Sequence, residues 1–467
     1  MSTLYNRLQA TAVDRPDHKA IIGCDGVEVC YQELIERVKQ FSLSLFSQLK
    51  KDVRPHVAVL MGNSIEQIVV TFALSRLNAV VVPLNPELKD EQVCQALSST
   101  AVGLVIVERG RLLSCGPTVQ VLPIETLISL SVEENVDFVI PPWNEGDTFL
   151  VTLSSGATGD PKPIMLSEQS KLKRAQQTWS LYDVSADDVV LNASPFFHSL
   201  GQRLTFVALL KGATLVLMDR FTPQRWIDTV VSAGVTFTIC VSSHLYALRE
   251  QLVSQGKRLH SLRTIVSSSA AIDKELKDYL FEQLGCAFYE IYGATEIAIA
   301  SNLEPRDASS KSASVGAPCR GVEVVILDDQ HQQLPVKEVG EIACRSALVF
   351  SGYLSQPEQT EAAHHQGYFL TGDLGYLDEE GYLYFVSRKK DMIISGGSNI
   401  YPLDIETVIL EHASISECAV IGIKDSYLGE AIIAVCVWQQ SEEQQEWAVR
   451  QWVNGQLPPF QRPLKYF

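Results

Sequence analysis

The segment from Ser154 to Lys162 gathers two glycines, three hydroxyl side chains and one lysine within nine positions. Glycine allows positive φ values, and backbone N–H groups in such turns form a concave site that favours an anion. The hydroxyls and the amine add hydrogen-bond donors and a full positive charge. The segment could therefore hold a polyphosphate. The residues that we expect to bind it are Ser154, Ser155, Gly156, Thr158, Gly159 and Lys162.

Two prolines distinguish this segment from the common P-loop, in which Gly-Lys-Ser/Thr opens a helix. Pro161 precedes Lys162 and Pro163 follows it. Proline cannot continue a helix, and it biases the residue before it toward extended conformations. We therefore expect a loop between two extended segments, the first being the apolar run Thr148–Leu153. The alternative for such a cluster of Ser, Gly, Asp and Pro is a surface linker.

A second group of polar residues follows a predicted strand that ends at Ile291. Tyr292 offers an aromatic face, Thr295 a hydroxyl and Glu296 a carboxylate. Carboxylate oxygens are ligands that Mg²⁺ prefers. The pattern favours a magnesium site, and its alternative is a strand and turn with an exposed glutamate.

Three further segments could either take part in a functional site or have only a structural role. Asp373 could accept both hydroxyls of a ribose diol, although the sequence Thr-Gly-Asp is also a common turn. The basic run Arg388–Lys390 could equally be a solvated charged turn. His198 directly follows two phenylalanines, and a histidine in such surroundings is more often packed in a core than catalytic.

Taken in order, these segments resemble the motifs of the adenylate-forming superfamily. It comprises acyl- and aryl-CoA synthetases, adenylation domains of peptide synthetases and firefly luciferases. The pattern is closest to the acyl- and aryl-CoA ligases, and the resemblance covers nearly the whole chain. The loop departs from the family pattern at Ser154, Ala157 and Pro163, where Thr, Ser or Thr, and Gly are usual.

The resemblance implies ATP and Mg²⁺ as cofactors. It places Lys162 and its loop on the β- and γ-phosphates, Thr295 near a phosphate and the metal on Glu296. Tyr292 is implied to stack on adenine, and Asp373 and Arg388 to bind ribose. Lys390 occupies the hinge position, and His198 closes the acid pocket. The implied catalytic residues are Lys162, His198, Thr295 and Glu296; the implied pocket residues are His198, Ser199, Ser268, Ser269 and Ile291.

The implied reaction is ATP-dependent activation of a carboxylic acid to an acyl-adenylate, with release of pyrophosphate. The acyl group then passes to a thiol, either CoA or the phosphopantetheine of an acyl or peptidyl carrier protein. Amino-acid-activating relatives commonly have Asp where this chain has Ser199, and side chains at Ser268, Ser269 and Ile291 would shorten the pocket. We therefore expect a small or medium acyl or aryl acid.

Two alternatives stay open at this point. The first is a stand-alone adenylation protein that loads an amino acid onto a carrier protein. The second is a degenerate, non-catalytic nucleotide-binding member, which Ala157 and Pro163 favour slightly. No residue distinguishes the oxygenation that luciferases perform.

Short apolar runs alternate with amphipathic stretches, which predicts an α/β fold with parallel sheets. We expect a large N-terminal domain (1–389) of two α/β layers plus a small β-barrel at about 321–386. A small, mobile α+β C-terminal domain (390–467) should follow, with the hinge near Lys390. Compared with the family, the chain stops before the terminal segment that carries a further lysine.

The net charge of −17 argues against a general nucleic-acid or anionic-membrane surface, so we expect neither partner. The ten cysteines are scattered without a C-x-x-C spacing, which favours reduced thiols in a cytoplasmic protein. The sequence begins without a signal-peptide pattern, and no apolar run approaches the length of a membrane span.

Overall fold

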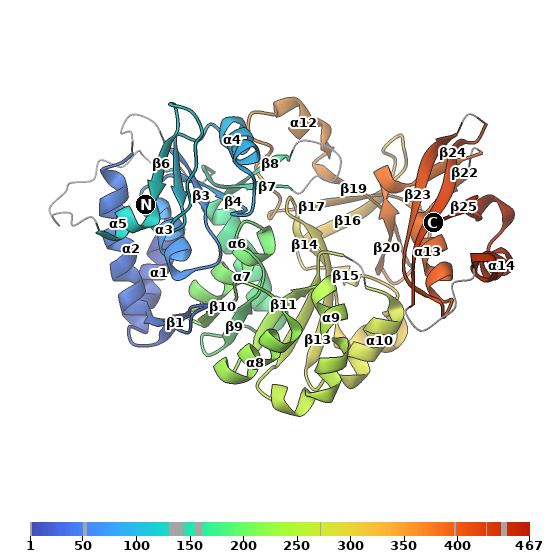
Figure 1. The fold of residues 1–467 in the computed structure, drawn as a ribbon, viewed down its shortest axis with the longest axis horizontal. Coiled ribbons are helices and arrows are strands. Elements are labelled where there is room, and N and C mark those ends of the chain that lie inside the picture. The colour runs from blue at the N-terminus through green and yellow to red at the C-terminus, as the bar shows by residue number, and fades with distance from the viewer. Residues whose placement is uncertain are drawn as a thin grey trace. The chain divides into compact units, whose positions relative to one another are not determined.

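The structure is a computed structural model that describes residues 2–49, 54–129, 143–144, 146–154, 161–270, 272–396, 398–425, 427–439 and 446–467 (Figure 1). The chain divides into two compact units. The first comprises Met1–Val322 and Arg345–His364, and the second comprises Glu323–Cys344 and His365–Phe467.

A six-stranded sheet in the first unit carries the predicted phosphate loop at its edge. Its order is β6-β5-β3-β4-β7-β8, parallel except for β8, which is antiparallel to β7. Strands β4 and β5 are buried along their whole length, as expected inside a parallel sheet. The strands are β3 His56–Leu60, β4 Val80–Leu84, β5 Leu104–Val107, β6 Gln120–Pro123, β7 Thr148–Leu153 and β8 Pro163–Ser167. The neighbouring helices are α1 Thr3–Asp14, α2 Tyr31–Phe46, α3 Ile65–Arg76, α4 Asp90–Ser99, α5 Ile124–Ser129 and α6 Glu168–Tyr182.

A nine-stranded sheet forms the second layer of the first unit, in the order β15-β14-β13-β12-β11-β9-β10-β1-β2. Its central strands are parallel, and antiparallel pairs complete both ends. The strands are β1 Lys19–Ile22, β2 Glu28–Cys30, β9 Val189–Asn192, β10 Thr214–Leu217, β11 Phe237–Val241, β12 Thr264–Ser268, β13 Ala287–Ala294, β14 Ala298–Leu303 and β15 Ala317–Pro318. The helices are α7 Ser199–Leu209, α8 Pro223–Ala233, α9 Ser242–Ser254, α10 Lys274–Gln283 and α11 Ala308–Lys311. Helix α12 Pro357–Ala362 instead follows the segment beside β8.

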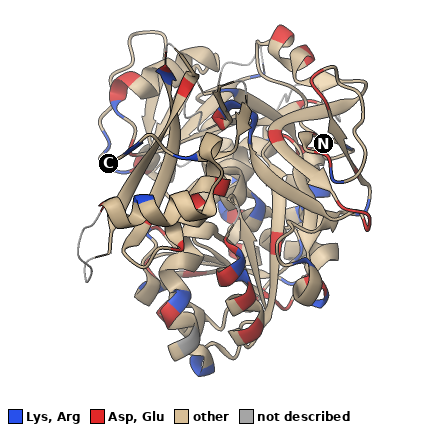
Figure 2. Cartoon of the chain, turned by 90° about the vertical axis from the view of Figure 1, so that its right-hand side faces the viewer, with Lys and Arg blue, Asp and Glu red and all other residues tan. Residues whose placement is uncertain are grey.

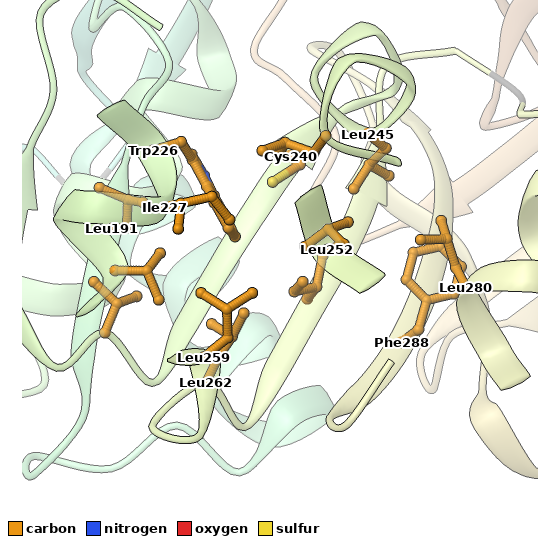
Figure 3. Packing of buried hydrophobic residues seen from close by; sticks show 14 of the residues in the cluster. Leu191, Trp226, Ile227, Cys240, Leu245, Leu252, Leu259, Leu262, Leu280 and Phe288 are labelled. Atoms are coloured by element: carbon orange, nitrogen blue, oxygen red, sulfur yellow. The ribbon is translucent and has the colours of Figure 1, made fainter. Parts of the chain in front are cut away.

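Helix α8 shows how local sequence builds this layer. Thr222 accepts a hydrogen bond from the Arg225 N–H, Pro223 occupies the first turn, and Gly234 ends the helix with a φ of 65°. Each is a preferred residue at its position. The buried face of α8 presents Trp226 to an apolar cluster that extends through residues of α9, α10, β11 and β13 (Figure 3).

Two smaller sheets form the second unit. One has the order β16-β17-β19-β18 with β20 paired to β19; the other has the order β22-β21-β24-β23 with β25 paired to β24. The first contains β16 Val322–Leu327, β17 Gly340–Ser346, β18 His364–His365, β19 Tyr368–Leu377 and β20 Leu383–Arg388. The second contains β21 Ile393–Ser395, β22 Ser398–Ile400, β23 Ile415–Asp425, β24 Gly429–Trp438 and β25 Lys465–Tyr466, with helices α13 Pro402–Leu410 and α14 Glu446–Gln456.

The expected mixed α/β architecture with a large and a small part is confirmed. The strands expected for the barrel belong to the same compact unit as the C-terminal residues. Only the short helix Lys389–Asp391 separates β20 from β21. The boundary at residues 389 and 390, with its hinge, stays a prediction.

Acidic and basic residues are interspersed along the same elements (Figure 2). Some form exposed ion pairs, such as Arg249–Glu275 at 2.9 Å and Lys274–Asp278 at 2.5 Å. Exposed pairs of this kind contribute about 0–1 kcal/mol each. The stability of the fold therefore rests mainly on its apolar layers. Among the described helices, none is long and apolar enough to cross a membrane.

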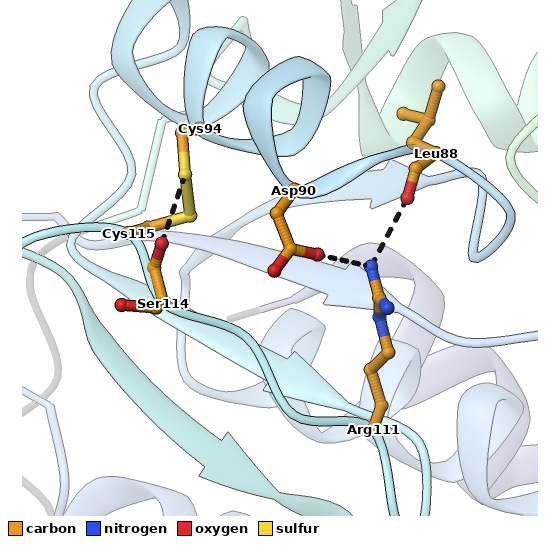
Figure 4. The surroundings of a disulfide bond; sticks show 6 residues. All are labelled: Leu88, Asp90, Cys94, Arg111, Ser114 and Cys115. Carbon is orange, nitrogen blue, oxygen red and sulfur yellow. Dashed lines mark hydrogen bonds and ion pairs between the residues drawn. A yellow bond between two sulfur atoms is a disulfide. The ribbon is translucent and has the colours of Figure 1, made fainter.

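The expectation that all cysteines are reduced is wrong for two of them. Cys94 of α4 forms a disulfide with Cys115, and their Cα atoms lie 5.4 Å apart (Figure 4). The chain after β5 folds back over α4, where Arg111 bonds Asp90 at 2.7 Å and the Leu88 carbonyl at 3.2 Å. This long-range contact brings the two thiols together, and the spacing of 21 residues gave no sign of it. The other eight cysteines are free.

Candidate active site

The predicted phosphate loop begins and ends on the hairpin β7–β8. The Ser154 N–H donates to the Lys162 carbonyl, and the Lys162 N–H donates to Ser154 Oγ, both at 3.0 Å. Pro163 begins an edge strand, where proline is tolerated. The expectation of a loop between two extended segments is therefore confirmed at its base. The other four loop residues of the prediction, Ser155, Gly156, Thr158 and Gly159, lie outside the described residues.

Tyr353 connects this loop to the predicted magnesium ligand. Its segment runs beside β8, because the Leu354 N–H donates to the Pro163 carbonyl at 2.8 Å and the Met165 N–H donates to a neighbouring carbonyl. The Tyr353 ring lies 5.1 Å from Lys162 Nζ, a distance at which a cation is attracted to the ring. Its hydroxyl donates to Glu296 Oε1 at 3.1 Å. Burial, followed by the charge of Glu296, raises the pKa of Tyr353, so the hydroxyl stays protonated.

The turn between β13 and β14 presents Thr295 and Glu296. The register of this hairpin shifts between Tyr292 and Gly293, as in a β-bulge. A Cβ on Gly293 would lie 1.9 Å from the Ala298 carbonyl oxygen, so only glycine fits there. Tyr292 is buried, and Thr295 Oγ1 donates to Ser199 Oγ at 3.2 Å. The hairpin thus brings the second motif to the start of α7.

Arg174 of α6 clamps this turn, and sequence reasoning missed it. Its guanidinium donates to the carbonyl oxygens of Thr295 at 2.7 Å, Glu296 at 3.0 Å and Leu348 at 2.6 Å. The Phe350 N–H also donates to the Glu296 carbonyl, at 2.7 Å. Burial, and then the charge of Arg203, lower the pKa of Arg174 to about 9. One arginine in an amphipathic helix carries no sequence signal for such a role.

His198 stands at the N-cap of α7. The loop before it is held by Asn63, whose Nδ2 donates to the Ser194 carbonyl at 3.0 Å. A Cβ on Gly201 would lie 2.3 Å from the Pro195 carbonyl oxygen, so the loop packs directly on the helix. The His198 side chain is exposed on one side and lies against Phe197, with ring centroids 4.4 Å apart. Desolvation lowers the pKa of His198, so its imidazole is neutral at pH 7.

The other three predicted pocket residues lie at or just beyond the end of the parallel pairing of β12 with β13. Ser267 of β12 pairs with Glu290 of β13, so Ser268 and Ile291 follow side by side. Ligands of open α/β sheets commonly bind at this edge. Ser269 has a φ of 84°, a conformation that favours glycine.

The predicted ribose ligands lie in the second unit. Asp373 of β19 is directly opposite Arg388 of β20, and Arg388 Nε is 3.5 Å from Asp373 Oδ1. Lys390 follows in the short helix and is exposed. Its neighbour Lys389 instead bonds Glu341 at 3.0 Å.

The described residues contain no cluster of three or more His, Cys, Asp or Glu that could hold a metal by themselves. Glu296 supplies one carboxylate, and its Oε2 has no hydrogen-bond or ion-pair partner in the part of the chain that the structure describes. Mg²⁺ is commonly bound by one or two carboxylates together with substrate phosphates and waters. The residues present therefore fit a magnesium ion that arrives with a nucleotide.

Comparison with known proteins matches residues 8–354 to the AMP-binding enzyme family and residues 404–467 to the AMP-binding enzyme C-terminal domain. The chain belongs to this family. It is 32% identical over 426 residues to an indoleacetate–CoA ligase of Aromatoleum aromaticum. This alignment covers 88% of this chain and 83% of that protein.

Solved structures agree with this assignment. The o-succinylbenzoate CoA synthetase of Bacillus subtilis in complex with its acyl-adenylate intermediate has a TM-score of 0.89 and 26% identity, covering 99% of this chain and 94% of that chain. The same enzyme with ATP and magnesium ion has a TM-score of 0.88 and 26% identity, covering 99% and 95%. This family member is thus an acid–thiol ligase that uses ATP and Mg²⁺, forms an acyl-adenylate and transfers the acyl group to a thiol.

Proposed function

We propose that this AMP-binding enzyme activates a small or medium acyl or aryl acid and transfers it to CoA. The observation that carries the proposal is the linkage of Lys162 to Glu296 through Tyr353. It combines a cation for phosphate charge with a carboxylate for magnesium. The names of relatives support the acid and the acceptor: besides the indoleacetate–CoA ligase, a feruloyl-CoA synthase of Amycolatopsis is 30% identical over 429 residues.

The roles that we propose for the first half-reaction agree with the positions of the residues. When bound, ATP supplies the α-phosphate that the carboxylate of the acid attacks, with pyrophosphate leaving. Lys162 and the loop bind the outer phosphates, Glu296 holds Mg²⁺, and Thr295 orients the α-phosphate. Catalysis of such transfers is mostly positioning and charge neutralisation. Arg174 contributes by fixing the backbone of Thr295 and Glu296.

Other proposed roles concern the acid, the nucleoside and the second half-reaction. The neutral His198 positions the carboxylate beside Ser199, while Tyr292 stacks on adenine. Asp373 and Arg388 bind ribose, and the C-terminal residues turn about Lys390 between the two half-reactions. We also propose a cytoplasmic location, which suits a reaction that consumes ATP and CoA and the eight free cysteines.

ATP–pyrophosphate exchange over a panel of acids tests the proposal, followed by CoA or a phosphopantetheinylated carrier protein as acceptor. We expect exchange with an aryl or short acyl acid and product formation with CoA. Nucleotide binding without exchange for any acid would instead identify a non-catalytic member. An α-amino acid as best substrate, with transfer to the carrier protein, would identify the stand-alone adenylation protein.

A further inference from the structure

Helices α6 and α7 carry three neighbouring cationic side chains, and the contacts described so far involve only one of them. Lys171 is buried, and its Nζ donates to Gln202 Oε1 at 2.5 Å. Arg174 is also buried, and its guanidinium is occupied by backbone carbonyls. Arg203 follows Gln202 on α7 and is partly exposed. Arg203 has no hydrogen bond or ion pair with any residue that the structure describes.

Although Arg203 is partly exposed, desolvation lowers its pKa, and an unpaired guanidinium that has lost part of its water is costly. Lys171 and Arg174 only repel it, since each of them has a pKa that the Arg203 charge lowers. The groups that interact favourably with Arg203 are the Tyr182 hydroxyl and the Cys319 thiol, and burial keeps both protonated by raising their pKa.

The carboxylate of Glu304, which acts on the same two side chains, does not neutralise Arg203. The charge of Glu304 contributes to the raised pKa of Tyr182 and of Cys319. Its Oε2, however, forms an ion pair with Arg306 Nε at 2.9 Å. Glu304 also makes no ion pair with Arg203 among the described contacts. Among the residues that the structure describes, Arg203 therefore has no anionic partner.

A second unpaired donor lies in the same surroundings. Asn302 is buried, and its Oδ1 accepts a hydrogen bond from the Tyr182 hydroxyl at 3.0 Å. Its Nδ2 is buried without a hydrogen-bond partner among the described residues. Tyr182 bonds Asn302 and interacts electrostatically with Arg203, so the amide and the guanidinium belong to the same neighbourhood.

Each donor has a fixed position relative to a residue proposed for the acid pocket. Asn302 is directly opposite Ile291 in the β13–β14 pair, and paired residues of antiparallel strands point to the same face of the sheet. Arg203 lies four residues after Ser199 on α7, so the two share one face of the helix. Ser199 in turn bonds Thr295, where the acid is activated. Arg203 is thus one helical turn beyond Ser199, and Asn302 lies beside Ile291.

We propose that Arg203 and Asn302 bind a second carboxylate of the substrate, so that the enzyme activates a dicarboxylic acid at one end. The inference rests on the proposed function, because it extends the same acid pocket. The carboxylate near His198 and Thr295 is the one activated, and the second stays ionised and pairs with Arg203. Arg203 is then a specificity-determining residue, and the same positive charge disfavours an acid with an ammonium group.

The test uses the full chain and pairs of acids, each pair consisting of a dicarboxylic acid and the acid in which a methyl replaces the second carboxylate. In ATP–pyrophosphate exchange we expect the wild type to prefer the dicarboxylic member. Arg203→Gln should lower kcat/KM for it by about 10- to 100-fold, the usual effect of losing a hydrogen bond to a charged group. Arg203→Lys, which keeps the charge, should retain part of the preference.

Two controls separate specificity from folding. The monocarboxylic acids should lose little or no activity in Arg203→Gln. The best dicarboxylic acid should raise the Tm of the wild type but not that of Arg203→Gln. Preference for the methyl-bearing acids, or equal losses for both members of each pair, would overturn the proposal while leaving acid activation intact. Absence of exchange with every acid would refute the proposed function, and the Tm shift would still decide whether the second carboxylate binds.

Discussion

Tyr353 is the side chain on which the linkage between Lys162 and Glu296 depends. Its ring contacts the Lys162 amine, and its hydroxyl bonds the Glu296 carboxylate. A tyrosine in this place fixes two charged groups without neutralising either of them. The expected consequence is that the carboxylate is oriented before the nucleotide arrives.

Tyr353→Phe separates these two functions, because it keeps the ring and removes the hydroxyl. We expect kcat for pyrophosphate exchange to fall about 10-fold, as for loss of one hydrogen bond to a charged group, with little change in KM for ATP. Tyr353→Leu, which removes the ring as well, should also raise KM for ATP. Initial rates over a range of ATP and Mg²⁺ concentrations measure both effects. Unchanged exchange kinetics in Tyr353→Phe would show that Glu296 needs no such support.

Ser269 combines a pocket position with an unfavourable backbone. Its φ of 84° is costly for a residue with a side chain, by about 1–3 kcal/mol, and glycine removes that cost. Glycine also loses more conformational entropy on folding, which destabilises the protein by about 0.5–1 kcal/mol. The net effect of Ser269→Gly should therefore be a stabilisation of about 1 kcal/mol. The substitution should also improve the activation of longer acids. Urea denaturation and exchange assays with an acid series measure the two effects.

Ser268→Gly is the matched control for that prediction. Ser268 belongs to β12 and is not among the described residues with positive φ, so glycine there should only destabilise the protein. Equal destabilisation by both substitutions would show that Ser269 is not strained.

At the scale of elements, the N-terminus of α1 is fastened by Glu168 from the first turn of α6. The Glu168 carboxylate accepts hydrogen bonds from Ser2 Oγ at 3.0 Å, the Leu4 N–H at 3.1 Å and Ser75 Oγ at 2.5 Å. A carboxylate at a helix N-terminus is favourable because of the helix dipole. Glu168 thereby joins three helices, α1, α3 and α6, through one buried group.

Glu168→Gln keeps the shape of the side chain but removes its charge and one acceptor. We expect the free energy of unfolding to fall by about 2–4 kcal/mol, since donors are left unpaired in a buried site. Urea denaturation measures this change. Glu275→Gln is the control: Glu275 also lies in a first helical turn, but its side chain is 82% exposed. A change there should stay below about 0.5 kcal/mol, and an equally small change in Glu168→Gln would contradict the anchoring role.

Elements with strong local signals could be predicted from the sequence. Helix α8 is delimited in the sequence by Thr222, Pro223 and Gly234, and strand β11 is a short run rich in β-branched and aromatic residues. The β1–β2 hairpin was missed, since its strands are short and β1 pairs with β10, almost two hundred residues later in the chain. The contiguous motifs around Lys162 and Glu296 could be predicted likewise. Arg174, Tyr353 and the disulfide act through contacts between distant segments, which composition and spacing do not encode.

At the scale of the whole molecule, the predicted site residues divide between the two compact units. Lys162, His198, Thr295 and Glu296 belong to the first, and Asp373 and Arg388 belong to the second. Most of the polar contacts described for the first group involve α6, α7 and the edges of the two large sheets. The core of the first unit must therefore stay folded for the chemistry to be possible, and its dependence on pH bears directly on activity.

His244 makes that dependence measurable. Its ring stacks on Phe221 with centroids 3.7 Å apart, and burial lowers the pKa of His244 to about 4 from an ordinary value of about 6.5. Between these values the unfolded chain binds a proton that the folded chain does not bind. The contribution of His244 to the free energy of unfolding should thus be complete above about pH 6.5 and be lost as the pH drops toward 4. Because the ring is only partly buried and solvent screens part of the effect, the loss should be at most about 3 kcal/mol. Other groups titrate in the same range, so the comparison is with His244→Gln, measured by urea denaturation across this range. In the variant, the free energy of unfolding should fall less steeply with decreasing pH, because the contribution of His244 is absent. Parallel plots of this free energy against pH for the two proteins would show that burial does not hold this histidine neutral.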